Sequence, residues 1–329
     1  MLKRLEETDK NLYYFHSYNP VFEAVNFTGW FKLNNFLGYV PPHWRRFAEE
    51  DWEIIKAFLR ENKIDLIINL RNEGPLRDKS YFRFKEIALH SKIEFWELDQ
   101  QEITNRSHHQ HLIKDQINLF ENNGINISPI NQSWLKDYTI DSGTSRIKSG
   151  EIGFFTGASQ DVKRWTECEW IELGRLFLEN TAYKIVIYSG QSSEEINLAQ
   201  NIARQLRTEF STEYCYLSGN HSLDSLCAHL SGLDLLISND TFCVHMSAFL
   251  DIPTIGLYFS TDSDIWGGFS SKFSGIQSQL GLGCKEFKKD AGNCNFYYSG
   301  CPAPCKNEVT AEKVFLVAKN YILSEMKNL

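Results

Sequence analysis

The second half of the chain alternates short apolar runs with longer segments of helical spacing, and this alternation constrains the fold more than any other feature. The expected strands cover 152–155, 183–188, 213–217, 233–238 and 254–258, and the expected helices cover 169–179, 194–206, 223–230, 244–250 and 311–326. Parallel neighbours need a long crossover connection, which these helices supply, so the pattern predicts βαβ units around a parallel sheet. The runs LDLLIS and PTIGLYF are apolar throughout, as expected for strands covered on both faces.

The first half of the chain is more polar and less regular. The elements expected there are strands over 12–15 and 64–70 and helices over 49–62 and 105–120. The stretch 122–149 is rich in Asn, Ser, Asp and Gly, which is typical of a connecting segment. We therefore place a domain boundary near residue 148, giving domains 1–148 and 149–329, and a length of 329 residues suits two domains.

The charge balance excludes some classes of function. The chain has 34 Lys and Arg against 42 Asp and Glu, a net charge of −8. A nucleic-acid binder needs a basic face for phosphate contacts, so this balance argues against one. The N-terminal MLKRLEETDK has no apolar stretch behind it, and no apolar run approaches the roughly 20 residues of a membrane span. The expected location is the cytoplasm, with peripheral association at the inner membrane as an alternative.

Two strand ends carry residues suited to a nucleotide. In open α/β sheets, ligands bind beyond the carboxyl ends of strands, near helix N-termini that attract anions. After 152–155 come Thr156 and Gly157, where small residues allow close backbone approach, and then Lys163, which can meet a phosphate. The alternative is a turn with a solvated lysine. After 183–188 comes Glu194, which can accept hydrogen bonds from a ribose diol. The alternative is an acidic first turn favoured by the helix dipole.

A third strand end carries Asp240, Thr241 and His245 directly after LDLLI. Asp240 or Thr241 can cap the following helix, which contributes about 1 kcal/mol and is a sufficient structural explanation for either residue. A diphosphate bound at this helix start would meet backbone N–H groups, the Thr241 hydroxyl and the His245 ring. The alternative for His245 is a buried histidine with its hydrogen bonds satisfied.

Four segments together resemble glycosyltransferase family 9, the ADP-heptose heptosyltransferases of lipopolysaccharide and related glycan assembly. The segments are GASQDVKRW, SGQSSEE, LDLLISNDTFCVHMSAFLDIPTIGLYFSTDSDIWG and CPAPCKNEVTAEKV. The likeness covers about residues 150–325, with the motifs in order and at family spacing. The first half resembles the family only loosely, through KIDLIINLR and the strand–helix pattern before it.

The resemblance implies a GT-B fold of two facing Rossmann-like domains, with the donor bound mainly by the second and the acceptor by the first. It also implies an inverting transfer that requires no metal cofactor. Carried over by position, Thr156 and Lys163 hold the donor diphosphate beside Gly157, and Lys163 neutralises charge as ADP leaves. Glu194, or its neighbour Glu195, binds the ribose. Asp240 contacts the heptose hydroxyls, while Thr241 and His245 contact the phosphates. The implied catalytic residues are Lys163 and Asp240.

Several positions depart from the family pattern. Phe242 and Gly268 replace the family's usual Gly and Pro. Family members also open with a strand and a Gly-Asp loop whose Asp is the general base, and no Gly-Asp occurs near this N-terminus. The chain is expected to join the pattern at the second strand, which leaves the N-terminal domain incomplete by one βα unit. Glu23, Glu73 and Asp78 are candidate bases by rough position only.

Cysteines and histidines form two further groups. Cys284, Cys294, Cys301 and Cys305 lie within a short Gly- and Pro-containing stretch, which suits either a structural Zn or Fe site or four free thiols. The remaining cysteines, namely Cys168, Cys215, Cys227 and Cys243, are interpreted as packing residues. His108, His109 and His111 are interpreted as a solvated helix face in preference to a metal site.

The function that these features predict is transfer of heptose, or a similar sugar, from an ADP-sugar donor to a lipopolysaccharide core, glycan or protein acceptor. The alternative from another class is a catalytically weakened relative that binds nucleotide sugar or glycan and lacks the general base. A nucleotide-dependent epimerase or dehydrogenase is disfavoured because no G-x-G-x-x-G follows a first strand.

Overall fold

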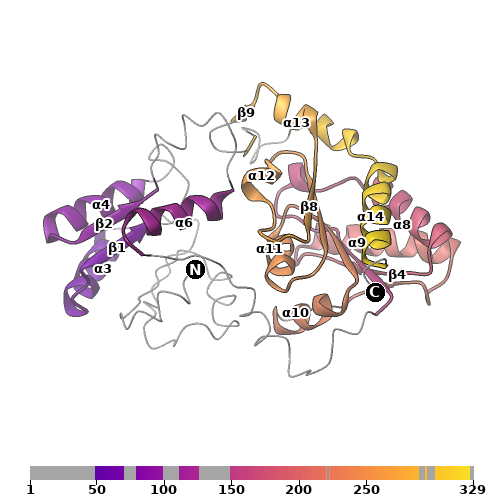
Figure 1. Cartoon of the computed structure of the whole chain (residues 1–329), viewed down its shortest axis with the longest axis horizontal. Coiled ribbons are helices and arrows are strands. Elements are labelled where there is room, and N and C mark those ends of the chain that lie inside the picture. Colours follow the sequence, from indigo (N-terminus) through magenta and orange to yellow (C-terminus); the bar gives the residue numbers. More distant parts are fainter. Residues whose placement is uncertain are drawn as a thin grey trace. The chain divides into compact units, whose positions relative to one another are not determined.

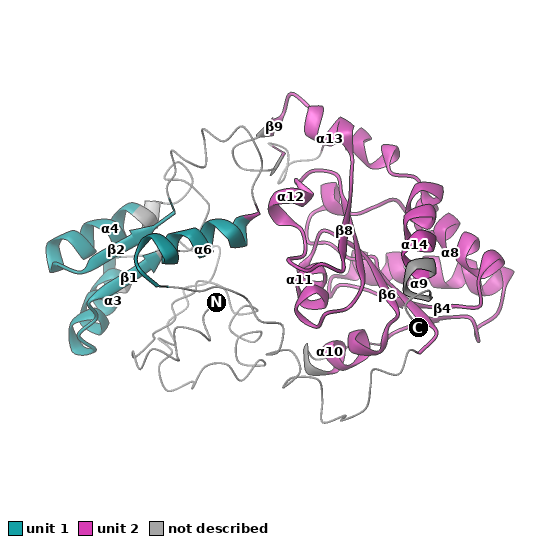
Figure 2. Cartoon of the chain, viewed as in Figure 1, with its two compact units in different colours: residues 1–107, 112–131 teal, residues 108–111, 132–329 magenta. Residues whose placement is uncertain are grey.

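The computed structural model describes residues 49–69, 79–98, 111–125, 149–219, 221, 223–288, 293–294 and 301–326. These residues divide into two compact units (Figure 2). Unit 1 comprises residues 1–107 and 112–131, and unit 2 comprises residues 108–111 and 132–329. The boundary expected near residue 148 falls at the edge of the undescribed stretch 126–148 and stays a prediction, as does the strand expected over 12–15.

Unit 1 contains a parallel strand pair with helices packed on it. Its elements are α3 (Glu49–Glu61), β1 (Leu66–Asn69), α4 (Lys79–Ser91), β2 (Glu94–Glu97) and α6 (Leu112–Asn122). β1 pairs in parallel with β2, and α4 is the crossover between them. Trp52, Ile55 and Leu59 recur at helical spacing on α3 and pack with Ile87 of α4. The helix expected over 49–62 and the strand expected over 64–70 are therefore confirmed.

Unit 2 is built on a six-stranded parallel sheet. Its strands are β3 (Glu151–Phe155), β4 (Lys184–Tyr188), β5 (Cys215–Leu217), β6 (Leu235–Asn239), β7 (Thr254–Tyr258) and β8 (Phe273–Gln277). They lie in the order β5-β4-β3-β6-β7-β8, and every pairing is parallel. The parallel sheet that the sequence predicts is confirmed, and both β6 and β7 are buried along their whole length.

Helices cover both faces of this sheet (Figure 1). They are α8 (Glu167–Asn180), α9 (Ser193–Glu209), α10 (Leu223–Gly232), α11 (Phe242–Phe249), α12 (Ser263–Trp266), α13 (Gln279–Gly283) and α14 (Ala311–Met326), with 3-10 turns η2 (Asp161–Lys163) and η4 (Pro304–Glu308) and a short hairpin of β9 (Phe287–Lys288) and β10 (Asn293–Cys294). The main core joins alternate residues of the central strands to α8, α9 and α14. α14 packs along α8, where Phe315 meets Phe177 edge to face at 5.0 Å.

The strand order places a switch point at the centre of the sheet. β3 is the first strand of unit 2, and the chain first builds outward through β4 and β5 before returning to add β6 on the other side of β3. In doubly wound sheets of this order, ligands bind at the carboxyl ends of the strands where the winding direction reverses. The topology thus points to the loops that follow β3 and β6.

One strand of this sheet is absent from the sequence-based expectation. β8, with the sequence FSGIQ, lies at the sheet edge and is only partly buried. Its central Gly275 and its polar residues weaken the strand pattern, so its strand state comes from pairing with β7. Among the described residues, no helix combines the length and apolarity that crossing a bilayer requires.

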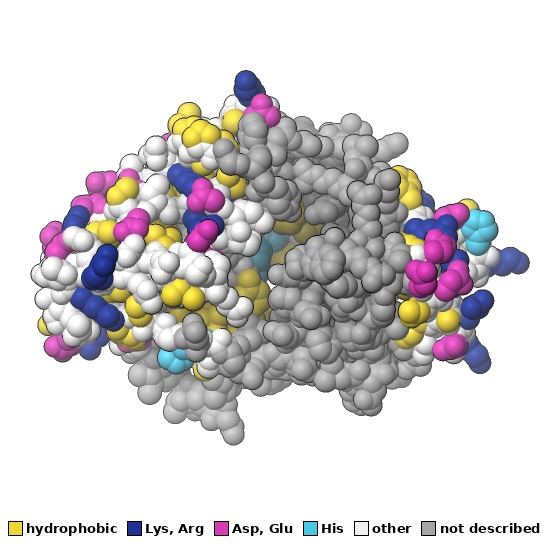
Figure 3. Space-filling view, turned by 180° about the vertical axis from the view of Figure 1, so that it is seen from behind, with side chains coloured by type: hydrophobic (Ala, Val, Ile, Leu, Met, Phe, Trp, Pro, Cys, Tyr) yellow, Lys and Arg dark blue, Asp and Glu magenta, His cyan; other side chains and the backbone are white. Residues whose placement is uncertain are grey.

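The surface of the described residues mixes both signs of charge. In Figure 3, Lys and Arg lie interspersed with Asp and Glu on the coloured part of the visible face. Several charged side chains of the described residues form exposed pairs, for example Arg175 with Glu172 and Glu209. A mixed surface of this kind is ordinary for a globular protein and is not the basic stripe that binds a nucleic-acid backbone.

Candidate functional site

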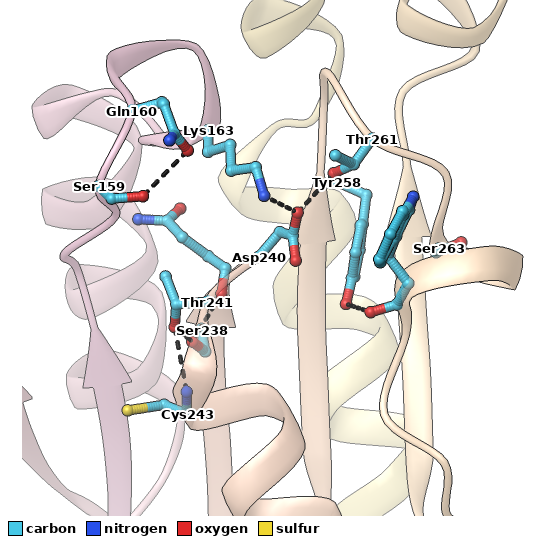
Figure 4. A network of polar contacts seen from close by, with 12 residues as sticks. Ser159, Gln160, Lys163, Ser238, Asp240, Thr241, Cys243, Tyr258, Thr261 and Ser263 are labelled. Carbon is cyan, nitrogen blue, oxygen red and sulfur yellow. Dashed lines mark hydrogen bonds and ion pairs between the residues drawn. The ribbon is translucent and has the colours of Figure 1, made fainter. Parts of the chain in front are cut away.

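A buried ion pair joins the two central strand ends of unit 2. Lys163, in η2 after β3, places its Nζ 2.6 Å from Oδ2 of Asp240, the residue directly after β6. The two side chains are only 12% and 6% exposed. Thr261, in the segment after β7, donates its hydroxyl to the same carboxylate oxygen at 2.6 Å (Figure 4). Three strand ends thus converge on one carboxylate at the switch point.

Asn239, the last residue of β6, fixes the loop that carries Lys163. Its buried side chain accepts a hydrogen bond from the Trp165 backbone N–H at 3.1 Å and donates to the Thr156 carbonyl at 2.8 Å. Trp165 is itself buried, and its indole N–H donates to the Val309 carbonyl at 2.8 Å. The loop is therefore held at both ends, which limits the directions that Lys163 can take.

Thr156 and Gly157 form the tight turn after β3. The buried Thr156 hydroxyl donates to the Tyr188 carbonyl of β4 at 3.1 Å, so its expected contact with a phosphate stays a prediction. Gly157 is required by space, because a Cβ there would lie 2.6 Å from the Gly190 nitrogen and 2.7 Å from Oε1 of Glu195. The turn therefore packs closely against the start of α9, and the approach of a phosphate to Gly157 stays a prediction.

The start of α9 separates the two candidate ribose ligands. Ser192 and Glu195 form a reciprocal capping box, which commits the Glu195 carboxylate to the helix N-terminus. Glu194 is instead exposed, and its Oε2 accepts two hydrogen bonds from Arg164, each at 3.2 Å. Of the two acidic residues, Glu194 is the one whose carboxylate is open to a ligand, as the sequence analysis expects.

α11 begins with Thr241 as its N-cap residue, whose hydroxyl accepts from the Cys243 N–H at 3.3 Å. This settles which of the two candidate caps is used. His245 lies one turn into the helix; the residue keeps an exposed edge, but protein surrounds most of its ring. The surrounding protein desolvates that ring and lowers its pKa, the nearby Asp240 opposes the shift, and the charges of His111 and Lys163 add to it. His245 therefore favours its neutral form.

His111 is placed differently from the sequence-based expectation. The expected helix over 105–120 begins at Leu112, so His111 precedes it, and the ring is half-buried in unit 2 instead of forming a solvated helix face. Its Nε2 donates to the Gly267 carbonyl at 2.9 Å, and its ring packs on Phe269. His108 and His109 lie outside the described residues.

Two successive carbonyls at the end of α12 are held by aromatic side chains. The buried Tyr258 hydroxyl donates to the Trp266 carbonyl at 3.2 Å, beside the Gly267 carbonyl that His111 holds. Burial raises the pKa of Tyr258 well above its ordinary range, and the Asp240 carboxylate adds to the shift. Tyr258 thus remains a neutral donor, and the TDSDIWG segment is fixed at its last turn.

The four C-terminal cysteines are free thiols in the structure. Burial raises the pKa of Cys305, and the other three members of the group add to the shift, so they lie within electrostatic range of it. Among the described residues, however, no three His, Cys, Asp or Glu side chains are arranged to hold a metal ion. The choice between a structural Zn or Fe ion and four free thiols therefore stays a prediction.

The four remaining cysteines do not behave alike. Cys215, Cys227 and Cys243 are buried, which confirms them as packing residues. Cys168 is exposed, and its sulfur lies 3.2 Å from the Thr166 hydroxyl, so the prediction that it packs in the core is wrong. It lies on the first turn of α8, where the helix surface faces outward.

The structure adds four residues to those that the sequence analysis selected. These are His111, Arg164, Asn239 and Thr261. Arg164, Asn239 and Thr261 stand inside the quoted motifs, and the first two are detectable as a charge beside Lys163 and as a polar residue ending a buried strand. His111 and Thr261 contact the site across long sequence separations. The candidate bases Glu23, Glu73 and Asp78 lie outside the described residues.

Sequence comparisons identify relatives for the part of the chain that carries this site. The model of glycosyltransferase family 9 (heptosyltransferase) matches residues 87–294. Lipopolysaccharide heptosyltransferase 1 of Salmonella typhimurium is 33% identical over 116 residues, which is 35% of this chain and 34% of the relative. Lipopolysaccharide heptosyltransferase 1 of Escherichia coli K12 is 28% identical over 176 residues, 50% of this chain and 51% of the relative. The matches therefore span about a third to a half of these relatives.

Structure comparisons extend over more of the chain. The E. coli heptosyltransferase WaaC with ADP aligns with a TM-score of 0.55 at 18% identity, covering 90% of this chain and 87% of that one. A family 9 glycosyltransferase from Veillonella parvula aligns with a TM-score of 0.58 at 17% identity, covering 87% and 82%. This likeness confirms the α/β fold of the GT-B class. With more than half of its residues matched by the family model, the chain belongs to glycosyltransferase family 9.

Proposed function

We propose that this chain transfers heptose, or a similar sugar, from an ADP-sugar to a lipopolysaccharide core, glycan or protein acceptor. Family membership and the names of its relatives support transfer of this kind. The observation that carries the proposal is the buried Lys163–Asp240 pair at the switch point of the sheet. A nucleotide donor is the ligand class for which that position in a doubly wound sheet is suited.

Lys163 supplies the positive charge that the departing nucleotide needs. Its ammonium is held in a poorly solvated place, where an electrostatic contact with a diphosphate is stronger than in water. The Asp240 carboxylate holds that ammonium before the donor binds, so little reorganisation is needed when charge develops. Asp240 then has a free lone pair for a sugar hydroxyl, in keeping with the contact to the heptose that the family resemblance implies.

The rest of the donor site follows from the neighbouring helix starts. The α11 N-terminus presents backbone N–H groups and the Thr241 hydroxyl to an anion, with the neutral His245 ring beside them as a hydrogen-bonding group. Glu194 binds the ribose diol at the start of α9. Charge compensation by Lys163 and by the helix start makes a catalytic metal unnecessary in this proposal, and the transfer is inverting, with positioning of the acceptor as the other main contribution.

The acceptor side is proposed from the family alone. Its residues and the general base belong to unit 1, and Glu23, Glu73 and Asp78 stay candidates by position. A lipopolysaccharide acceptor places the enzyme in the cytoplasm, in peripheral contact with the inner membrane where such acceptors are built. Nucleic acid is no part of the proposal, because the chain carries a net charge of −8 and a nucleic-acid binder needs a basic face.

Calorimetry and a transfer assay test the proposal together. The purified chain should bind ADP, and it should move heptose from ADP-heptose to heptose-free lipopolysaccharide in the presence of EDTA. Lys163→Ala should abolish transfer, whereas Lys319→Ala, a change at an exposed position on α14, should leave turnover unchanged. Undiminished turnover in Lys163→Ala contradicts the assignment. ADP binding without any transfer by the wild-type chain favours the alternative of a nucleotide-sugar-binding relative.

A further inference from the structure

Arg164 and Glu194 form a contact of unusual shape for a surface ion pair. Both terminal nitrogens of Arg164 lie 3.2 Å from the same oxygen, Oε2 of Glu194. The second carboxylate oxygen, Oε1, has no hydrogen bond from the described residues. The Arg164 side chain is only 16% exposed, whereas that of Glu194 is 75% exposed. A largely buried cation therefore holds one oxygen of a carboxylate whose other oxygen is presented outward.

Stability does not explain this pair. An ion pair with so exposed a partner contributes little to the free energy of unfolding. The N-terminus of α9 is already capped by Ser192 and Glu195, so Glu194 is not needed to begin the helix. What the pair does change is the direction of the Glu194 side chain, which would otherwise sample several rotamers in solvent.

The segment that carries Arg164 is held firmly enough to fix the direction of the Glu194 side chain. The Arg164 backbone N–H donates to the Asp161 carbonyl at 2.9 Å, and the next residue, Trp165, is buried and bonded to Asn239. Arg164 is extended, with φ −83° and ψ 122°, so its side chain and those of its neighbours point in different directions. Lys163 reaches Asp240, while Arg164 reaches Glu194. Two adjacent cationic side chains thus each hold a carboxylate in place, one before the start of α11 and one at the start of α9.

We propose that Arg164 is a positioning residue that holds Glu194 for hydrogen bonding to the ribose diol of the donor nucleotide. The inference rests on the proposed function, because it presupposes a nucleotide donor. It assigns a role in recognition of the ribose to a residue that does not itself touch the ribose. Direct contact of Arg164 with a phosphate is the competing explanation, since its buried Nε has no hydrogen-bond partner among the described residues.

Two nucleotides separate these explanations. Affinity for ADP and for 2′,3′-dideoxy-ADP is measured by calorimetry on the wild type, Arg164→Gln, Glu194→Gln and the double variant. We expect Arg164→Gln to weaken ADP binding by about fivefold to tenfold, the equivalent of one ordinary hydrogen bond. Binding of the dideoxy nucleotide should be unchanged, because the diol is absent. In the Glu194→Gln background, Arg164→Gln should have no further effect. In turnover, KM for the donor should rise while kcat is kept.

Arg175→Gln is the matched control, because Arg175 also pairs with an exposed glutamate on a helix but lies away from the strand ends. It should leave both nucleotide affinities unchanged. Equal losses for ADP and the dideoxy nucleotide in Arg164→Gln overturn the inference in favour of direct phosphate contact, and unchanged ADP affinity overturns it outright. Failure of the wild type to bind ADP contradicts the proposed function itself, a result distinct from either of these.

Discussion

The side chain of Asn239 accepts a hydrogen bond from the backbone N–H of Trp165, and this contact ties the end of β6 to the loop that follows β3. Replacing Asn239 by Ala leaves the buried Trp165 N–H and the Thr156 carbonyl without their partner. We expect a loss of roughly 1–3 kcal/mol in the free energy of unfolding, measured with urea, together with weaker ADP binding. Asn201→Ala, on the surface of α9, should change neither quantity by a comparable amount.

Substitutions in the Lys163–Asp240 pair should affect the free energy of unfolding and the transfer activity differently. Lys163→Met leaves a buried carboxylate without its cation, which typically costs about 3–5 kcal/mol. Adding Asp240→Asn removes the unpaired charge, so the double variant should regain part of the lost stability while its transfer activity stays absent. Urea unfolding of the four proteins measures the coupling between the two sites. Strictly additive losses would show that the two side chains do not interact as described.

Gly157 should not tolerate even one added carbon. A Cβ there would meet the Gly190 backbone and the Glu195 carboxylate at 2.6 and 2.7 Å, so the turn after β3 must shift. Gly157→Ala is expected to lower both the melting temperature and ADP affinity. Gly232→Ala is the control, because the space around that position is open. Comparable behaviour of the two variants in thermal unfolding would contradict the close approach at Gly157.

The lowered pKa of His245 should make the free energy of unfolding depend on pH, and the direction of the pKa shift determines the sign of that dependence. Desolvation, the largest cause, lowers its pKa in the folded chain below the ordinary value of about 6.5, so the unfolded chain takes up the proton more readily. Stability is therefore fully present above that pH and is lost as the pH falls below it. His245→Gln should lose less stability than the wild type between about pH 7.5 and pH 5.5, measured by urea unfolding. An identical pH dependence in both proteins would refute the shift.

The charge of His111 should have a measurable effect on the pKa of His245. Its charge helps to lower the pKa of His245, so His111→Phe, which keeps an aromatic ring beside Phe269, is expected to raise the pKa of His245. An NMR titration of the His245 ring protons measures this directly. His90→Phe, at an exposed position on α4, should leave the titration unchanged. A lower or unaltered pKa in His111→Phe would count against the proximity of the two rings.

Sequence patterns were sufficient where the structure is set by local packing. β7 and α14 have the bounds that their apolar patterns predict, because each is a continuous run ended by a local signal. The positions of Lys163, Glu194 and Asp240 near one edge of the sheet could be predicted because the strand ends of a parallel sheet lie at the same edge, while their binding roles stay predictions. α4, β2 and β8 were not expected, since their charged or glycine-containing sequences become regular only through pairing and packing partners distant in the chain.

The residues that the sequence analysis did not select as site residues share one property: each contacts a partner that is distant in the sequence. In the sequence, Arg164 cannot be told apart from an ordinary solvated arginine. Only the position of α9 in the fold shows that its partner is Glu194. His111 has two histidine neighbours within a few residues, His108 and His109, which suggested a solvated face, yet its contacts include the Gly267 carbonyl and Phe269. No local periodicity records a contact of that kind, because it is fixed by the tertiary fold.

The packing of α14 on α8 has a consequence for the chain as it leaves the ribosome. α8 presents Trp170 and Phe177 to a core that is completed only by Val314, Phe315 and Ala318 of α14. During synthesis these aromatic side chains stay uncovered on that side until α14 has been made, and in that interval they form an apolar surface open to chaperones and proteases. Quality control of this protein should therefore depend on α14, far along the chain from the loops that carry Lys163 and Asp240.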